Sequence, residues 1–199
     1  MKKTLDIMFE LIDACQTVEE VEELYMRQRI AANVFWKQRQ IALSAEDELE
    51  RQKALAKCRY INEVFASSVP VSKKIQPFTA PHVFNGIAIS ARAKIGKGRT
   101  IFQNVTIGSN TLIDSKNAGF PIIGENCYIG AGANIIGNVK IGNNVRVGVG
   151  CTITVDVPDN ATVVQSRPTI IKKVAPPDNT WYNVTGFLKH HSPNKRKDH

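Results

Sequence analysis

Residues 122–153 read IIGENCYIGAGANIIGNVKIGNNVRVGVGCTI, and an aliphatic residue returns at every sixth position of this stretch. These positions are Ile123, Ile129, Ile135, Ile141, Val147 and Ile153. An earlier run has the same spacing at Ile89, Ile95, Ile101 and Ile107. A period of six fits neither a helix nor an ordinary strand, but it is typical of a hexapeptide β-helix. The sequence therefore predicts a mainly β fold, a parallel β-helix of hexapeptide repeats.

The residues around the aliphatic positions fit the same coil. Glycine often follows directly, at Gly96, Gly108, Gly124, Gly130, Gly142 and Gly148. A small or β-branched residue often comes four positions later, as at Ala93, Val105, Cys127 and Ala133. We expect the aliphatic side chains to point into the coil, and glycine to stand where a side chain would crowd the backbone or where φ is positive. Three hexads would form one turn, stacked on the next at about 4.8 Å.

The period breaks twice. Val69, Ile75 and Pro81 keep step with one another, but Ile89 comes two residues late, which puts an insertion around residues 82–88. Between Ile107 and Ile123 about four extra residues must lie within 109–121. Insertions in a solenoid leave the coil at its corners, and binding sites favour such loops. The two breaks are therefore where we expect the chemistry.

The repeat divides the chain into three parts. Residues 1–66 are predicted as an N-terminal α-helical domain, in which an apolar stripe over 5–12 marks a first helix. A capping box of Thr17 and Glu20 opens a second helix, and the spacing of Ser44 and Asp47 opens a third. Residues 67–172 form the predicted β-helix, with 163–174 as a closing strand, and 173–199 a C-terminal extension with a basic tail. We interpret the helices as a cap on the solenoid end or a surface between subunits.

The composition of the chain indicates which kinds of partner it can bind and in which compartment it is expected. The formal net charge is +8, and the basic residues are spread over the helices and the tail without interleaved aromatic residues. This distribution argues against binding to nucleic acid. It favours an anionic cofactor or acceptor as the partner of the positive charge. No run reaches the length of a membrane span, and acidic residues interrupt the N-terminal apolar stretch, so we expect no span and no secretory signal. Four cysteines without CxxC spacing are interpreted as reduced, which predicts a cytoplasmic protein.

His82 is the one histidine of the predicted β-helix; the others stand in the tail. A three-histidine metal site needs three different ligand positions, which this count does not supply, so we predict no metal. His82 lies in the first insertion, where a group with a pKa near 7 can serve as general base. A structural role and a catalytic role both remain open on this evidence.

Three stretches carry a family resemblance: His82-Val-Phe-Asn-Gly-Ile-Ala-Ile, Ile101-Phe-Gln-Asn-Val-Thr-Ile-Gly and Ile122-Ile-Gly-Glu-Asn-Cys-Tyr-Ile-Gly-Ala-Gly-Ala. They resemble the serine acetyltransferase-like branch of the hexapeptide acyltransferases. The resemblance implies a left-handed β-helix, a homotrimer, and direct acetyl transfer from acetyl-CoA to a hydroxyl. His82 matches the family's catalytic base. Carried over by position, the contacts to CoA in a groove between subunits fall on Ser109, Gly130, Ala131, Arg146, Gly148 and Val149.

Three positions depart from the family pattern. Ser68 and Pro81 stand where the family has Asp residues near the catalytic His, and Gly119-Phe120 matches its Arg-His, which helps to hold serine. We therefore predict a saccharide as acceptor, such as a capsule or exopolysaccharide precursor, with a backbone carbonyl orienting His82. A divergent serine O-acetyltransferase of cysteine biosynthesis and a catalytically inactive trimeric scaffold are the alternatives. Whether the helices join two trimers is left open.

Overall fold

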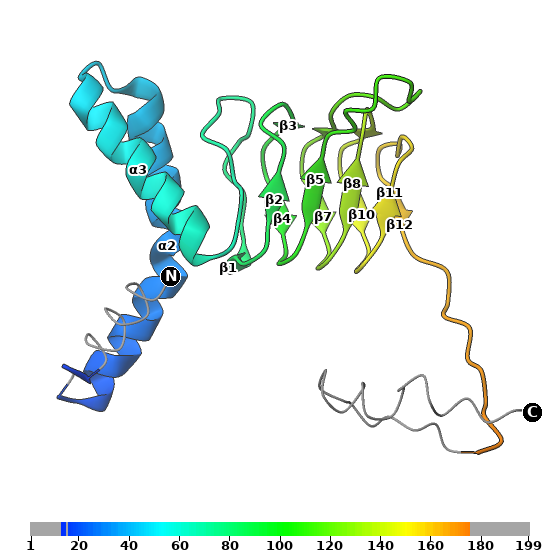
Figure 1. Ribbon diagram of the computed structural model, residues 1–199, viewed down its shortest axis with the longest axis horizontal. Helices are drawn as coiled ribbons and strands as arrows, with labels where there is room; N and C mark the ends of the chain where they lie inside the picture. The colour runs from blue at the N-terminus through cyan, green and yellow to red at the C-terminus, as the bar shows by residue number, and fades with distance from the viewer. Residues whose placement is uncertain (1–12, 15, 176–199) are drawn as a thin grey trace, which may run out of the picture. The chain divides into compact units, whose positions relative to one another are not determined.

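The computed structural model describes residues 13, 14 and 16–175 (Figure 1). Two helices come first, α2 (Val18–Ser44) and α3 (Glu48–Val64). Short strands follow: β1 (Pro81–Phe84), β2 (Ala88–Ile89), β3 (Lys94–Ile95), β4 (Thr100–Ile101), β5 (Thr106–Gly108), β6 (Ile122–Ile123), β7 (Tyr128–Ile129), β8 (Asn134–Ile136), β9 (Lys140–Ile141), β10 (Arg146–Val147), β11 (Thr152–Ile153) and β12 (Thr162–Val163). The predicted helix over 5–12 and the basic tail lie outside the described residues.

The helix ends follow capping chemistry. Thr17 caps α2 and its hydroxyl accepts from the Glu20 N–H at 3.2 Å, as predicted. The predicted start of the next helix at Ser44 is wrong. Ser44 is the last residue of α2 and donates its hydroxyl back to the Gln40 carbonyl, whereas Asp47 caps α3 by accepting from the Glu50 N–H at 2.9 Å. A carboxylate accepts from the free N–H groups of a first turn better than a hydroxyl that is already bonded within α2.

The strands pair in parallel and form three flat sides. The first side is β2, β5, β8 and β11; the second is β3, β6 and β9; the third is β4, β7, β10 and β12. Each coil visits the three sides in turn, and Figure 1 shows the successive coils stacked along one direction. Ile107 pairs with Ile135, and Ile129 with Val147, so the aliphatic positions stand in register. The predicted parallel β-helix is confirmed.

The core is the column of aliphatic side chains inside the coils. The inward positions of both runs are buried, among them Ile101, Ile107, Ile129, Ile135 and Ile141. The small or β-branched residue four positions after the aliphatic one, such as Cys127 or Val145, is buried between them. Cys127 donates its thiol to the Gly142 carbonyl, and burial raises the pKa of that thiol. Each coil thus buries its apolar residues mainly against the coils before and after it.

The glycines after the aliphatic positions are needed for close backbone approach. A Cβ on Gly124 would lie 2.5 Å from the Gly142 carbonyl carbon, and one on Gly142 would lie 2.5 Å from the Asp159 nitrogen. Positive φ occurs instead further round the corners, where Asn104, Asn126 and Asn144 adopt values of 58°, 55° and 55°. Asparagine tolerates this region better than most residues, and the Asn126 and Asn144 side chains bond to each other at 2.9 Å.

Two sequence expectations about the ends of the β-helix are wrong. Pro81 does not occupy an inward position: it is exposed, and the bridge between Thr79 and Thr100 puts Ala80 opposite Ile101. The closing strand predicted over 163–174 ends at Val163, since β12 is Thr162–Val163 and no further described residue pairs after it. Residues to Gln165 form one compact unit and Ser166 begins another. The domain boundaries at 66 and 172 stay predictions.

Aromatic side chains close the N-terminal end of the β-helix. Phe35 and Trp36 of α2 contact Phe84 and Phe78 edge to face, with centroids 5.0 Å apart in both pairs. Arg39 is buried and donates to the carbonyl oxygens of Ser72 and Ile75 in the first coil. The helices therefore cover an end that would otherwise expose apolar residues and unpaired backbone groups.

We expect Gly124→Ala to lower the free energy of unfolding by about 1–3 kcal/mol, because its Cβ meets rigid backbone rather than a movable side chain. Urea denaturation followed by circular dichroism measures the change. Gly148→Ala is the matched control, since its Cβ would meet its nearest atom at 3.1 Å. Equal losses in both variants would contradict the role given to backbone crowding.

Candidate functional site

His82 lies in β1, on the first insertion, and its side chain is exposed. The insertion runs from Thr79, which pairs with the third side, to Ala88, which begins the first side. The next residue, Val83, is buried and has a φ of 54°. A β-branched residue rarely adopts this conformation, and such strain is most common at functional sites. The backbone that presents His82 is therefore held in a costly shape by its surroundings.

Aromatic rings flank the imidazole. The centroids of His82 and Phe102 are 6.0 Å apart with the rings tilted by 52°, and Phe102 lies 5.0 Å from Tyr128. Asn85 donates its amide to the backbone carbonyl of His82 at 3.0 Å. Within the described residues no hydrogen bond to the imidazole itself is seen. The expected backbone carbonyl that orients the ring stays a prediction.

Several of the predicted CoA contacts line the corner where the third side turns into the first, next to the insertion that carries His82. Asn85 of the insertion accepts from the Asn104 N–H at 2.9 Å, which stacks the insertion on the next coil. At the same corner, Gly132 donates to Gln103 at 3.0 Å and Gly150 to Ala131 at 2.8 Å. Ala131 and Val149 thus occupy the same corner position in two successive coils. We name this column, from the His82 insertion to Val149, the histidine corner.

Gly130 and Gly148, which were predicted at the CoA site, allow the backbones of successive coils to approach closely at this corner. A Cβ on Gly130 would lie 2.8 Å from the Val149 nitrogen, and one on Gly148 would lie 3.1 Å from the Val163 carbonyl oxygen. Arg146 stands beside the corner on the third side, between Tyr128 and Thr162 in register, and its side chain is exposed. An exposed guanidinium at this place can bind a phosphate group.

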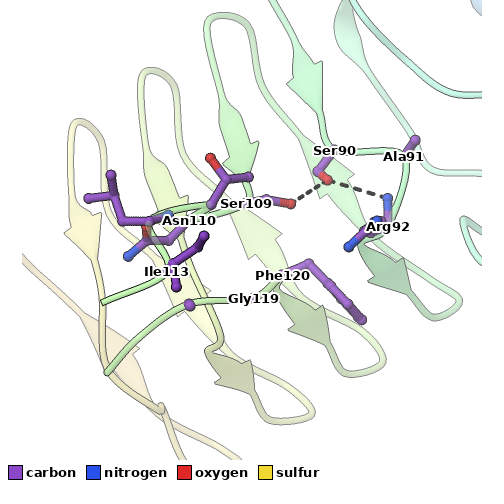
Figure 2. A pocket seen from close by; sticks show the side chains of 11 residues that line it. Ser90, Ala91, Arg92, Ser109, Asn110, Ile113, Gly119 and Phe120 are labelled. Carbon is purple, nitrogen blue, oxygen red and sulfur yellow. Dashed lines mark hydrogen bonds between the residues drawn. The ribbon is translucent and has the colours of Figure 1, made fainter. Parts of the chain in front are cut away.

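Ser109 stands at a different corner, where the first side turns into the second. Its hydroxyl contacts the Ser90 hydroxyl at 2.6 Å, as Figure 2 shows. The whole first side therefore separates Ser109 from the histidine corner. Of the predicted site residues, one chain brings together His82, Gly130, Ala131, Arg146, Gly148 and Val149, and leaves Ser109 apart.

The second insertion forms a well-tied loop at this other corner. Asn110 and Gly119 exchange two backbone hydrogen bonds of 2.9 Å, which close its base. The Asn110 amide donates to the Ser115 hydroxyl at 2.7 Å. Asn117 donates to the carbonyl oxygens of Ile136 at 3.2 Å and Thr154 at 3.3 Å. The loop is thereby fastened to two later coils.

A cavity of about 740 Å³ lies between this loop and the turn after β2. Ser90, Ala91 and Arg92 line it from the turn, and Ser109 and the loop through Phe120 from the other side (Figure 2). Leu112, Ile113 and Phe120 make most of its lining apolar. Arg92 is its one basic side chain among the described residues. Gly119 and Phe120, which stand where the family has Arg-His, thus line this cavity.

Sequence reasoning missed Arg92. The hexad pattern places it in a turn like any other, and only the stacking of one coil on the next brings it beside the second insertion. It also missed the contact of Phe102 with Tyr128, which stand 26 positions apart in sequence and lie on adjacent coils of the third side. Tyr128 precedes its inward aliphatic residue and Phe102 follows its own, so the two rings occupy different positions of the repeat and no single recurring position signals them.

The outward residues of the sides differ in charge. On the first side they are Ala88, Thr106, Gly108, Asn134, Ile136 and Thr152. On the second side they are Lys94, Ile122 and Lys140. The outward residues of the first side are therefore all uncharged. Within the described residues no three His, Cys, Asp or Glu side chains gather as a metal site would require, and no helix is long and apolar enough to cross a bilayer.

Known proteins resemble this chain in its repeat region. Residues 120–154 match the family profile described as bacterial transferase hexapeptide (six repeats). A serine acetyltransferase of Synechococcus elongatus is 39% identical over 79 residues, which are 40% of this chain and 32% of that protein. One of Staphylococcus aureus is 38% identical over 88 residues, 44% of this chain and 40% of that protein.

Solved structures agree. The soybean serine acetyltransferase apoenzyme matches with a TM-score of 0.57 and 27% identity, over 79% of this chain and 63% of that one. The repeat region of the chain is thus similar to that of serine acetyltransferases. The resemblance to that branch of the hexapeptide acyltransferases is confirmed, and with it the left-handed β-helix and the N-terminal helical part. The chain spans less than half the length of the curated relatives it matches.

We expect Asn117→Ala to loosen the second insertion without unfolding the β-helix, because two hydrogen bonds to later coils are lost, each worth about 0.5–1.5 kcal/mol. Hydrogen exchange of residues 110–119 should become faster. Asn138→Ala is the control, since its contact to Asn117 is through the backbone N–H and survives the change. Equal protection of the loop in Asn117→Ala and the unmodified protein would refute the fastening role.

Proposed function

We propose that this chain is an acetyl-CoA-dependent O-acetyltransferase with His82 as general base. The single observation that carries the proposal is the histidine corner. An exposed histidine on a strained insertion stands at the head of a column of small residues, and an arginine flanks that column. Similarity to serine acetyltransferases supports acetyl-CoA as the donor. No metal is part of the proposal.

The residues fit a direct transfer. His82 would take the proton from the acceptor hydroxyl while that oxygen attacks the thioester carbonyl carbon. The carbon–sulfur bond then breaks, the acetyl group stays on the acceptor oxygen, and the CoA sulfur leaves and receives a proton from the imidazolium. A backbone N–H would stabilise the oxyanion of the tetrahedral intermediate. The described cysteines are buried and are not nucleophiles in this scheme.

The site is proposed to form between copies in a homotrimer. The histidine corner and the cavity flank the first side of the same chain, so neither reaches the other within one copy. The outward residues of the first side are uncharged, whereas the second side carries lysines, which makes the first side the better packing surface. Rotating one copy about a three-fold axis along that side would bring one chain's cavity to the next chain's His82. Pairing of trimers through the helices and a cytoplasmic location stay predictions.

L-Serine is the first candidate for the acceptor. The relatives and the solved structures that match are serine acetyltransferases, and a soybean enzyme complexed with serine matches with a TM-score of 0.56 and 26% identity. Arg92 supplies the cavity with a cation that can bind a carboxylate in place of the missing Arg-His pair. These observations favour the serine alternative over the saccharide that the sequence departures had suggested.

A saccharide is kept as second candidate on one observation. Leu112, Ile113 and Phe120 give the cavity a largely apolar lining, which suits the face of a sugar ring better than a zwitterion. Free thiol release from acetyl-CoA with serine and with a panel of sugars separates the two. If CoA binds and neither class turns over, the acceptor lies outside both. If CoA does not bind, the inactive scaffold is the better description.

If serine is the acceptor, we expect Arg92→Ala to raise the KM for serine tenfold or more with a smaller change in kcat, because a charge-assisted bond to the carboxylate is lost. Steady-state kinetics with varied serine measures this. Lys94→Ala removes a neighbouring exposed charge on the second side and is the control. A KM that is equally affected in both variants would remove Arg92 from the acceptor site.

Mixing two variants tests the site between copies. At serine concentrations well below the KM, His82→Ala and Arg92→Ala should each have low activity alone. Trimers reassembled from an equal mixture should recover about a quarter of the full activity, because one in four contacts joins an intact His82 to an intact Arg92. Activity no greater than the sum of the separate variants would mean that the two residues do not share a site across copies.

A further inference from the structure

The second side of the β-helix begins with stacked lysines. Ile75 and Ile95 pair in parallel, so the residues before them, Lys74 and Lys94, stand opposite each other on neighbouring coils. Both side chains are exposed, as is that of Lys73 in the turn before them. We name Lys73, Lys74 and Lys94 the lysine patch.

The coils that carry the lysine patch supply no carboxylate to it. Residues 64–113 contain six lysine and arginine residues and no Asp or Glu. In the part of the chain that the structure describes, no ion pair involves the three lysines. Like charges directly opposite each other on neighbouring strands destabilise a sheet, and the coils are stacked at about 4.8 Å. The fold therefore tolerates an electrostatic cost at positions that the core does not use.

The other end of the same side is balanced in charge. Ile141 pairs with Val157, which puts Asp156 opposite Lys140. The Asp156 carboxylate also accepts from the Lys140 backbone N–H at 2.8 Å. Between the two ends the outward residue is the uncharged Ile122. The unbalanced positive charge is thus confined to the first two coils of this side.

The backbone under the lysine patch is already fixed. Arg39 of α2 is buried and donates to the carbonyl oxygens of Ser72 and Ile75, which flank Lys73 and Lys74. The Lys74 N–H donates to the Ser72 hydroxyl at 3.2 Å. A partner would therefore meet cations on a backbone that needs no further ordering, which lowers the entropic cost of binding.

The position of the charge distinguishes between classes of anionic partner. A bilayer lying on this flat side would also meet Asp156 and Asp159 at its other end, and anionic lipid would be repelled there. Single-stranded nucleic acid binds by stacking its bases on aromatic rings, and none of the described outward residues of this side is aromatic. A short acidic segment of polypeptide needs only the first two coils.

We propose that the lysine patch is a docking surface for a short acidic segment of a partner protein. The carboxylates of the segment would lie between Lys74 and Lys94 and relieve the repulsion between them. This surface is separate from the proposed transferase chemistry, because it uses neither His82 nor Arg92. Docking there would bring the partner to the coils that also carry the cavity.

The test measures binding of fluorescein-labelled poly-L-glutamate to the full chain by fluorescence anisotropy. The patch variant combines Lys74→Gln with Lys94→Gln. Its matched control combines Lys53→Gln with Lys57→Gln, which removes the same charge from exposed positions of α3. We expect the patch variant to bind about five- to tenfold more weakly than the unmodified chain, and the control to bind as the unmodified chain does. Added salt should weaken the patch-dependent binding.

Equal binding by the patch variant and the control would overturn the inference. Vesicles of phosphatidylglycerol are the second probe. Vesicle binding that depends on the lysine patch, without such dependence for poly-L-glutamate, would assign the surface to a membrane and overturn the inference as well.

Acetyl-CoA turnover, measured in parallel, separates this inference from the proposed function. We expect the patch variant to keep the turnover of the unmodified chain. Loss of turnover in that variant would put the lysines in the transferase site and overturn the docking surface. An unmodified chain that binds poly-L-glutamate through the lysine patch but turns over no acetyl-CoA would overturn only the proposed function.

Discussion

Close approach of backbone to backbone at the corners of the β-helix is the constraint on which the rest depends. The chain turns every six residues because a glycine stands where the next coil's peptide leaves no room, as Gly124 does against Gly142. This contact fixes the stacking, and the stacking keeps Ile129 on Val147 and Ile107 on Ile135. Once the coils are in register, side chains far apart in sequence share a corner. Both halves of the candidate site are products of that register.

Spacing alone predicted the parallel β-helix, the inward columns and the places of the two insertions, since a six-residue period leaves few other folds. It could not find Arg92 beside Ser109, because that neighbourhood depends on which corner each insertion leaves from. Pro81 was misplaced because the first coil is one residue shorter on its third side. The strand expected to Val174 has apolar residues but no coil beyond it to pair with in the described chain.

The sequence motifs and the neighbours in space bear on different parts of the proposed function. The resemblance, carried by the stretches around His82 and Ile101 and after Ile122, gave the donor and the base. The departures at Ser68 and Phe120 suggested a neutral acceptor. Arg92 changes that balance, because a positive charge lost at one point of a cavity can be supplied from the adjoining coil. A substrate preference inferred from missing residues therefore needs the neighbours in space as well as those in sequence.

The bond from Asn117 to the Thr154 carbonyl spans 37 residues and sets an order of events during synthesis. The loop leaves the ribosome before the coils that fasten it, so it emerges without its anchors. Its apolar tip is then unsupported until β8 and β11 have stacked. The fastening of this loop is thus completed only after β11 has stacked, later than the pairing of β2 with β5 beside which the cavity lies.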